Sequence, residues 1–238
     1  MLKKQWQKVN YTYANSKFYF DLCPAGYSLV KSLAPIINKW AKGKVLDVGA
    51  GMLVHRKLLQ GNCKQYVSLD IARNHPELDI VADAKSMPIN NDEFDTVFCS
   101  QVLEHDAQPE MIILEIFRVL KPGGIVIISV PHLSYLHSEP YDFFRFTQYG
   151  ISYLLEKSGF VVCNIIPAGG LACFLLTIPS IMFMTLFGTV PLIKYLSLSL
   201  VILINKVAYF IDSASDRSKI FALNYIAVGQ KPDKQYQF

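Results

Sequence analysis

The sequence of 238 residues predicts an α/β fold built on a mostly parallel β-sheet with helices on both faces. Between residues 44 and 166, short apolar segments of strand length alternate with segments of helical period. Glycines and aspartates follow several of these strands, at the end where such sheets bind ligands. A last strand-like segment comes only after the apolar residues 171–216, so we expect the chain to leave the sheet and return to it.

The expected strands are short apolar runs bounded by turn residues. They cover residues 44–48, 66–69, 78–82, 94–99, 124–130, 160–166 and 221–229. The expected helices carry apolar residues at helical spacing and cover residues 29–40, 53–59, 110–120 and 147–157. Residues 120–124 contain Pro122 and two glycines, which predicts a tight turn leading into the fifth strand.

These segments divide the chain into four expected parts. An aromatic and helical arm covers residues 1–43, and the sheet domain covers residues 44–170 and 217–231. A hydrophobic helical insertion covers residues 171–216, and a short tail covers residues 232–238.

The composition excludes some partners. The net charge is +4, and the basic residues are scattered apart from Lys3, Lys4 and Lys8, so no basic stripe predicts binding to nucleic acid. The five cysteines form no CxxC pair and are expected to be reduced thiols. Residues 1–10 are polar and lack the apolar segment of a secretory signal, so the sheet domain is expected in the cytoplasm.

The first strand ends in the segment Val45-Leu-Asp-Val-Gly-Ala-Gly51. Glycine at a strand-to-helix turn lets a ligand approach the backbone, and the following helix offers free N–H groups. A nicotinamide site would place a third glycine where Leu53 stands, so this turn alone does not specify a cofactor.

Further polar residues follow the next strands in the order that a nucleoside site requires. Asp70 ends the second strand, 19 residues after Gly51, where its carboxylate can accept hydrogen bonds from a ribose diol. Asp83 follows the third strand and can accept from an exocyclic amine, while Ser100 and Gln101 lie at the end of the fourth.

Together, the segments "LDVGAG", "FDTV...LEH" and "RVLKPGG" resemble the class I S-adenosylmethionine-dependent methyltransferases of the small-molecule kind. The resemblance covers residues 44–166 and the final strand. It implies a Rossmann-like sheet of seven strands with the last one antiparallel, and S-adenosylmethionine as methyl donor. It also implies a set of cofactor-binding residues: Asp47, Gly49, Ala50, Gly51, Asp70, Ile71, Asp83, Ala84, Met87, Ser100 and Gln101.

The acceptor is expected to contact the loop 131–147, which follows the fifth strand. His137 and then His132 are the candidate bases for a hydroxyl acceptor, because an imidazole titrates near neutral pH. Asp142 would orient the base or share its role, and Arg145 would bind a phosphate or carboxylate of the acceptor. Alternatively, Asp142 and Arg145 pair with each other and cap the next helix. We expect no metal site, since the five histidines are dispersed in the sequence.

Residues 171–193 carry no charged side chain. Because the strands before and after the insertion belong to one sheet, it must form two arms, 171–187 and 192–211, joined by a turn. Three interpretations stay open: a hairpin at the membrane interface, a homodimer surface, or a hairpin that spans the membrane.

The interface interpretation and a resemblance of "EPYDFFRFT" to surface-polysaccharide enzymes favour O-methylation of a sugar or lipid-linked glycan at the cytoplasmic face of a membrane. A methyltransferase of a quinone-type lipid and a non-catalytic cofactor-binding scaffold are the alternatives.

Overall fold

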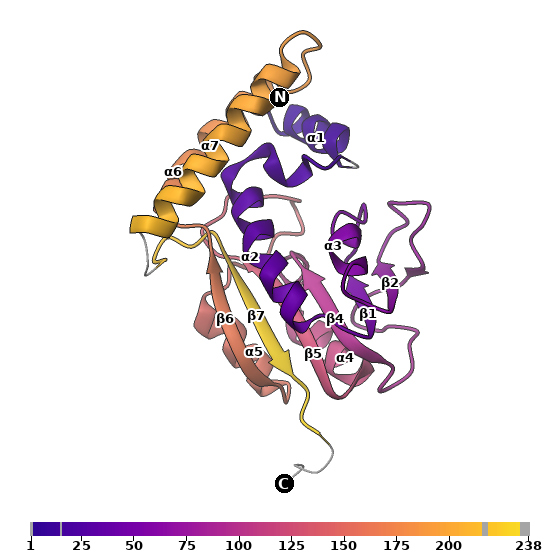
Figure 1. Cartoon of the computed structure of the whole chain (residues 1–238). Helices are drawn as coiled ribbons and strands as arrows, with labels where there is room; N and C mark the ends of the chain where they lie inside the picture. The colour runs from indigo at the N-terminus through magenta and orange to yellow at the C-terminus, as the bar shows by residue number, and fades with distance from the viewer. Residues whose placement is uncertain (1, 15, 216–218, 234–238) are drawn as a thin grey trace. The chain divides into compact units, whose positions relative to one another are not determined.

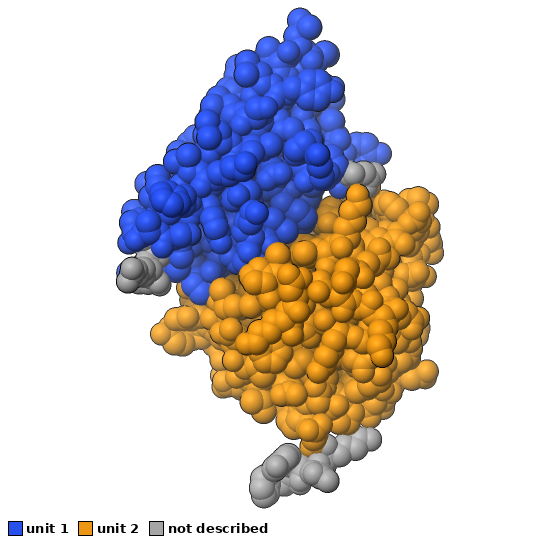
Figure 2. Space-filling model, in the orientation of Figure 1, with its two compact units in different colours: residues 1–33, 167–224 blue, residues 34–166, 225–238 orange. Residues whose placement is uncertain are grey.

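The structure is a computed structural model, and it describes residues 2–14, 16–215 and 219–233. It divides into two compact units (Figure 2). Unit 1 consists of Met1–Leu33 and Pro167–Asn224, and unit 2 consists of Ala34–Ile166 and Tyr225–Phe238. The expected arm 1–43 is therefore divided between the units at residue 33. Of the expected tail 232–238, only residues 232 and 233 are described; residue 216 also lies outside the described residues.

A seven-stranded sheet with the order β3-β2-β1-β4-β5-β7-β6 confirms the predicted fold (Figure 1). The strands are β1 (Lys44–Val48), β2 (Gln65–Asp70), β3 (Ile80–Val81), β4 (Phe94–Ser100), β5 (Leu120–Pro131), β6 (Val161–Ala168) and β7 (Asn224–Gln230). Strands β1 to β5 pair in parallel. Lys231 donates its N–H to Gly124 and accepts from Gly123, so the end of β7 runs antiparallel to β5.

Buried apolar residues explain why these segments form central strands. β1, β4 and β5 are almost wholly buried, as expected for parallel strands covered on both faces. The register pairs Val48 with Cys99 and Ser100 with Ser129. The carboxyl ends of β1, β4 and β5 therefore meet at one edge of the sheet.

The helices of unit 2 are α3 (Arg56–Gln60), α4 (Pro109–Val119) and α5 (Gln148–Lys157), with a short 3₁₀ helix η2 (Leu103–His105). Proline at the first position starts α4, and Thr147 caps α5 by accepting from the N–H of Gly150 at 3.0 Å.

Two predicted details were wrong. The helix after β1 begins at Arg56 instead of Leu53, because Leu53 takes a left-handed conformation with φ 57°. Residues 120–124 are not a tight turn but the irregular first part of β5, in which Leu120 pairs with Phe94.

Unit 1 contains α1 (Leu2–Tyr13), η1 (Tyr19–Leu22), α6 (Leu171–Phe187) and α7 (Lys194–Ser215), together with the first part of α2 (Pro24–Trp40). Helices α6 and α7 lie side by side (Figure 1). Asp212, near the end of α7, accepts from Ala172 and Cys173 at the start of α6, at 2.7 and 3.0 Å. The two helices therefore form an antiparallel hairpin whose base is closed by a helix cap.

Helix α1 packs against this hairpin, which the sequence did not predict. The side chains of Val9, Tyr13 and Met184 belong to one buried cluster, and the Tyr13 hydroxyl donates to the Gly188 carbonyl at 3.2 Å. Among the described residues, α7 alone is long and apolar enough to cross a membrane. A third of its 18-residue apolar segment is buried in the structure.

Candidate active site

The turn after β1 is held against the end of β2. The N–H groups of Gly49 and Ala50 both donate to the Leu69 carbonyl, at 2.8 and 3.0 Å. The N–H of Gly51 donates to Oδ2 of Asp70 at 2.8 Å. The glycines at both ends of this turn have positive φ.

The two glycines have different surroundings. A Cβ atom on Gly49 would lie 2.2 Å from Cγ2 of Val102, so this position is packed. A Cβ atom on Gly51 would meet nothing within 4 Å, so Gly51 borders open space beside the Asp70 carboxylate. Ile71, the next residue after Asp70, exposes 72% of its surface.

Asp47 lies deeper, buried in β1, where it accepts from the Tyr66 hydroxyl at 2.8 Å. Burial raises its pKa to about 7; the Tyr66 hydrogen bond opposes this, and the charge of Asp70 adds to it. In this structure the Asp47 carboxyl therefore ties β1 to β2.

The predicted adenine-side residues surround the loop after β3. Oδ1 of Asp83 accepts from the N–H of Lys85 at 2.8 Å, and Ala84 lies between them, half-buried. Met87 is buried and donates its N–H to Glu115 at 2.9 Å. These bonds fix the loop that follows Asp83.

Ser100 and Gln101 lie at the end of β4, as expected. The hydroxyls of Ser100 and Ser129 are 2.7 Å apart, and the N–H of Gln101 donates to the Ser129 carbonyl at 2.9 Å. Gln101 has φ 56°, an uncommon conformation that is often found at functional sites.

In the loop after β5, Arg145 and Asp142 pair with each other. Nη1 and Nη2 of Arg145 donate to the two carboxylate oxygens of Asp142, at 2.6 and 2.8 Å. These bonds lower the pKa of Asp142 to about 2. Arg145 also donates to the carbonyls of Ser134 and Tyr135. Asp142 and Arg145 therefore pair with each other, which was the alternative to a direct role in binding the acceptor. The hydrogen bonds of the Arg145 guanidinium are made within the loop.

The same loop brings His137 to a residue that the sequence reasoning missed. Glu104 in η2 is fully buried, and neither carboxylate oxygen has a hydrogen-bond partner. Its Oε1 lies 3.7 Å from Nε2 of His105 and 3.8 Å from Nε2 of His137. Burial alone would lower the pKa of His137, but Glu104, the Tyr135 carbonyl and Asp142 together raise it.

His132 does not belong to the group formed by Glu104, His105 and His137. Its ring centroid is 5.2 Å from that of Tyr225. The "LEH" segment contained the signal for Glu104, but the burial of its carboxylate could not be read from the sequence.

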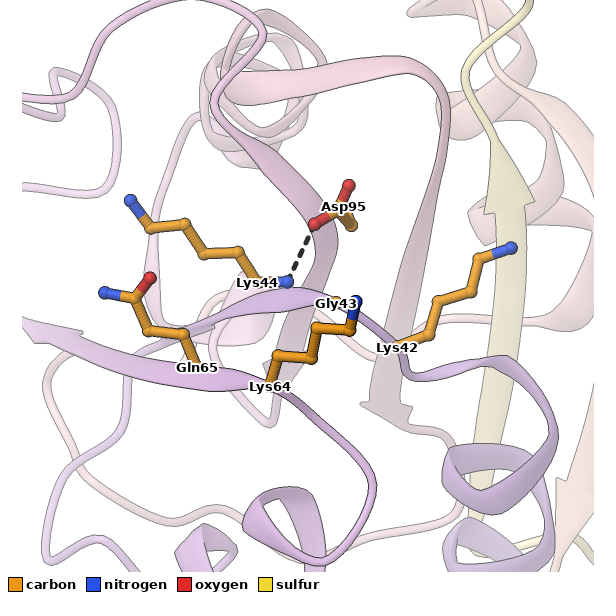
Figure 3. Close-up of a pocket in the computed structure, with 6 residues that line it drawn as sticks. All are labelled: Lys42, Gly43, Lys44, Lys64, Gln65 and Asp95. Carbon is orange, nitrogen blue, oxygen red and sulfur yellow. Dashed lines mark hydrogen bonds between the residues drawn. The ribbon is translucent and has the colours of Figure 1, made fainter.

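A separate hollow of about 480 Å³ lies at the amino ends of β1 and β2 (Figure 3). It is lined by Lys42, Gly43, Lys44, Lys64, Gln65 and Asp95. The N–H of Lys44 donates to Asp95 there at 2.7 Å. None of the predicted site residues lines this hollow, which therefore carries no part of the proposed chemistry.

Comparison with known proteins agrees with the geometry. Residues 46–128 match the model of a methyltransferase domain. This segment is therefore similar to methyltransferase domains, and the sheet around it has the fold of the class I S-adenosylmethionine-dependent methyltransferases. The matched domain supports an enzyme that uses S-adenosylmethionine as methyl donor.

One curated relative is the ubiquinone biosynthesis O-methyltransferase of Thiobacillus denitrificans, which is 28% identical over 131 residues, or 48% of this chain and 55% of that protein. The chain spans from about a fifth to about half the length of the curated relatives it first matches.

Solved structures agree in fold. A chain of the complex of the Haloferax volcanii Trm112 methyltransferase activator with a methyltransferase has a TM-score of 0.60, 17% identity, and coverage of 94% of this chain and 98% of that chain. The 4+2 cyclase SpnF has a TM-score of 0.59, 19% identity, and coverage of 87% and 81%. Because this fold also occurs in a cyclase, fold alone does not decide the reaction.

The residues present fit the methyl donor. The Asp70 carboxylate and the open space beside Gly51 lie together at the carboxyl ends of adjacent strands, and the exposed Ile71 offers an apolar surface to a base. The donor carries a reactive sulfonium group of its own.

Proposed function

We propose that this chain transfers the methyl group of S-adenosylmethionine to a hydroxyl of a small molecule carried by a lipid, such as a lipid-linked glycan intermediate. The observation that carries the proposal is the Asp70 carboxylate, fixed by the N–H of Gly51 at the edge of the open space. There it would bind ribose hydroxyls, while the turn after β1 admits the methionine part of the donor.

The acceptor would contact the neighbouring strand ends. Glu104 follows β4 and His137 follows β5, and these two strands pair in the sheet. During transfer the C–S bond of the donor breaks, a C–O bond forms and the hydroxyl proton leaves. A buried carboxylate beside two imidazoles can assist the loss of that proton.

The composition of the α6–α7 hairpin in unit 1 favours contact with a lipid surface. Its buried faces carry small and polar residues, among them Thr177, Ser180, Ser197 and Asn205. Its exposed residues are mostly large and apolar. They include Leu175, Met182, Leu186, Leu196, Leu203 and Phe210. Helices that face lipid have this arrangement, with small and polar residues between the helices and apolar residues on the exposed side.

Hydroxyl groups on both helices follow the same pattern. Thr177, Thr185 and Ser197 each donate to the carbonyl four residues earlier, at 2.6 to 2.9 Å. This bond satisfies a hydroxyl without water, as in membrane helices. These features favour a membrane surface over a homodimer as the cover of the hairpin. The proposed location is the cytoplasmic face of that membrane, where the sheet domain is expected from the sequence.

A quinone-type lipid is the second candidate acceptor. The ubiquinone O-methyltransferase relative favours it. The pairing of Arg145 with Asp142 also favours it, because it removes the free guanidinium that a glycan phosphate would bind.

The test of the reaction uses the full-length protein, radiolabelled S-adenosylmethionine and a lipid extract, followed by phase partition. We expect label in the organic phase with wild type and none with Asp70→Ala. Mild acid would then move the label to the aqueous phase for a lipid-linked sugar but leave it in the organic phase for a quinone. Transfer to no fraction by folded wild type would refute the proposal and favour a non-catalytic scaffold.

The membrane part is tested by sedimentation with vesicles of anionic phospholipid. Leu196, Leu203 and Phe210 share one exposed face of α7, at 72%, 58% and 73% exposure. Changing all three to Ser should abolish co-sedimentation. The matched control changes Tyr149, Tyr153 and Val161 to Ser, which are equally exposed in unit 2. Equal binding by both triple variants, or a triple α7 variant that only loses dimerisation, would overturn the membrane assignment.

A further inference from the structure

Glu104, His105 and His137 form a cluster that neither the predicted cofactor site nor the loop pairing uses. The carboxylate of Glu104 is 0% exposed, and neither of its oxygens has a hydrogen-bond partner. A carboxylate at this depth without hydrogen bonds is costly, so a cation bound directly to it would be favourable.

Both imidazoles present the same atom to this carboxylate. Nδ1 of His105 lies 2.6 Å from the Tyr141 carbonyl oxygen, and Nδ1 of His137 lies 3.3 Å from the Tyr135 carbonyl oxygen. A carbonyl only accepts, so Nδ1 of His105 carries the proton and donates, whereas Nδ1 of His137 also lies 3.4 Å from Nη2 of Arg145, which only donates. In the neutral His105 ring Nε2 therefore keeps its lone pair, and Nε2 is in both rings the nitrogen that lies near Glu104.

Neither imidazole makes a hydrogen bond to the Glu104 carboxylate. The gaps of 3.7 and 3.8 Å are longer than a hydrogen bond. The two ring centroids are 4.8 Å apart, so both imidazoles lie beside the carboxylate. A single cation between the three donor atoms could contact the carboxylate and both imidazoles at once.

We propose that Glu104, His105 and His137 bind a divalent transition-metal ion. Their donor atoms all lie within 4.8 Å of one another. Zn²⁺ binds imidazole nitrogen and carboxylate oxygen at about 2.0 to 2.2 Å, so ligands of one ion lie about 3 to 4 Å apart. Backbone carbonyls that hold the remote nitrogen of each histidine are the usual outer partners of metal ligands.

Three protein ligands leave a coordination position open, which is the pattern of catalytic metal sites. Both histidine side chains are about a quarter exposed, so the open position is accessible to a small molecule. An acceptor hydroxyl bound there would lose its proton more easily. This role rests on the proposed function, whereas metal binding itself does not.

The test titrates tag-free, chelator-treated full-length protein with Co²⁺ and follows its visible absorption, and then displaces it with Zn²⁺. We expect one equivalent to bind wild type, and Glu104→Gln and His137→Ala each to lose at least about tenfold in affinity. The control is His75→Ala, which removes a half-buried histidine of the same unit and should keep wild-type affinity.

No stoichiometric binding, or equal affinity in wild type and both variants, would overturn the metal site. If Glu104→Gln does not fold, His105→Ala replaces it in a thermal unfolding test. Zn²⁺ should raise the Tm of wild type but not that of His105→Ala. The same rise in wild type and His105→Ala would also overturn the metal site. Wild type that binds the ion but transfers no methyl group would refute the proposed function alone.

Discussion

The two glycines of the turn after β1 offer a sharp test, because one is packed and the other borders open space. Both have positive φ, 71° at Gly49 and 51° at Gly51, so alanine at either costs about 1 to 2 kcal/mol of backbone strain. At Gly49 the new methyl also lies 2.2 Å from Val102, and such overpacking adds about 1 to 3 kcal/mol. Gly49→Ala should therefore lower the free energy of unfolding by about 2 to 5 kcal/mol.

Gly51→Ala meets no atom and should cost only the strain. Its methyl enters the space assigned to the donor, so the affinity for S-adenosylhomocysteine should fall at least about tenfold, or 1.4 kcal/mol. Urea unfolding measures the stabilities, and calorimetry measures the affinity. Val102→Ala added to Gly49→Ala should restore the overpacking part of the lost stability. Equal destabilisation by the two single variants, or wild-type affinity in folded Gly51→Ala, would refute the reasoning.

Three further predictions concern stability. The pKa of Asp47 is about 7 in the folded protein, above its ordinary value of 3.8. The stability that the protonated carboxyl contributes is therefore fully present below pH 3.8 and is lost as the pH rises through 7. Unfolding of Asp47→Asn between pH 4 and 7 should depend less on pH than that of wild type, and an unchanged dependence would contradict the assignment. Asp212→Ala removes the acceptor of two amides at the start of α6, one half-buried at Ala172 and one buried at Cys173, and should cost about 1 to 3 kcal/mol in thermal unfolding, whereas the exposed Ser213→Ala should cost almost nothing. Thr147→Ala removes the cap on Gly150 and should cost about 1 kcal/mol; a variant as stable as wild type would show that the cap is not needed.

Much of the sheet could be predicted, because buried parallel strands are continuous apolar runs. The strand 44–48 has the bounds expected, and the strand expected at 94–99 extends by one residue to Ser100. Helix α1 could not be predicted, since five of its first eight residues are Lys or Gln and its apolar residues find their partners on α6, far along the chain. Local patterns do not contain such long-range packing.

The places of the residues proposed to bind the donor could be predicted, since these residues follow strands in sequence order. The acceptor side could not. His105 and His137 are distant in sequence and meet only because β4 and β5 are neighbours in the sheet. The dispersed histidines therefore gave no sign of a cluster. The pairing of Asp142 with Arg145 was foreseeable as one of two options, and only the structure shows the bidentate contact.

A crystal structure with S-adenosylhomocysteine tests the central claim most directly. The account predicts that the ribose hydroxyls lie within hydrogen-bond distance of the Asp70 carboxylate and that the homocysteine part passes beside Gly51. A nucleoside bound elsewhere, or crystals of folded protein that do not bind it at saturating concentration, would contradict the account.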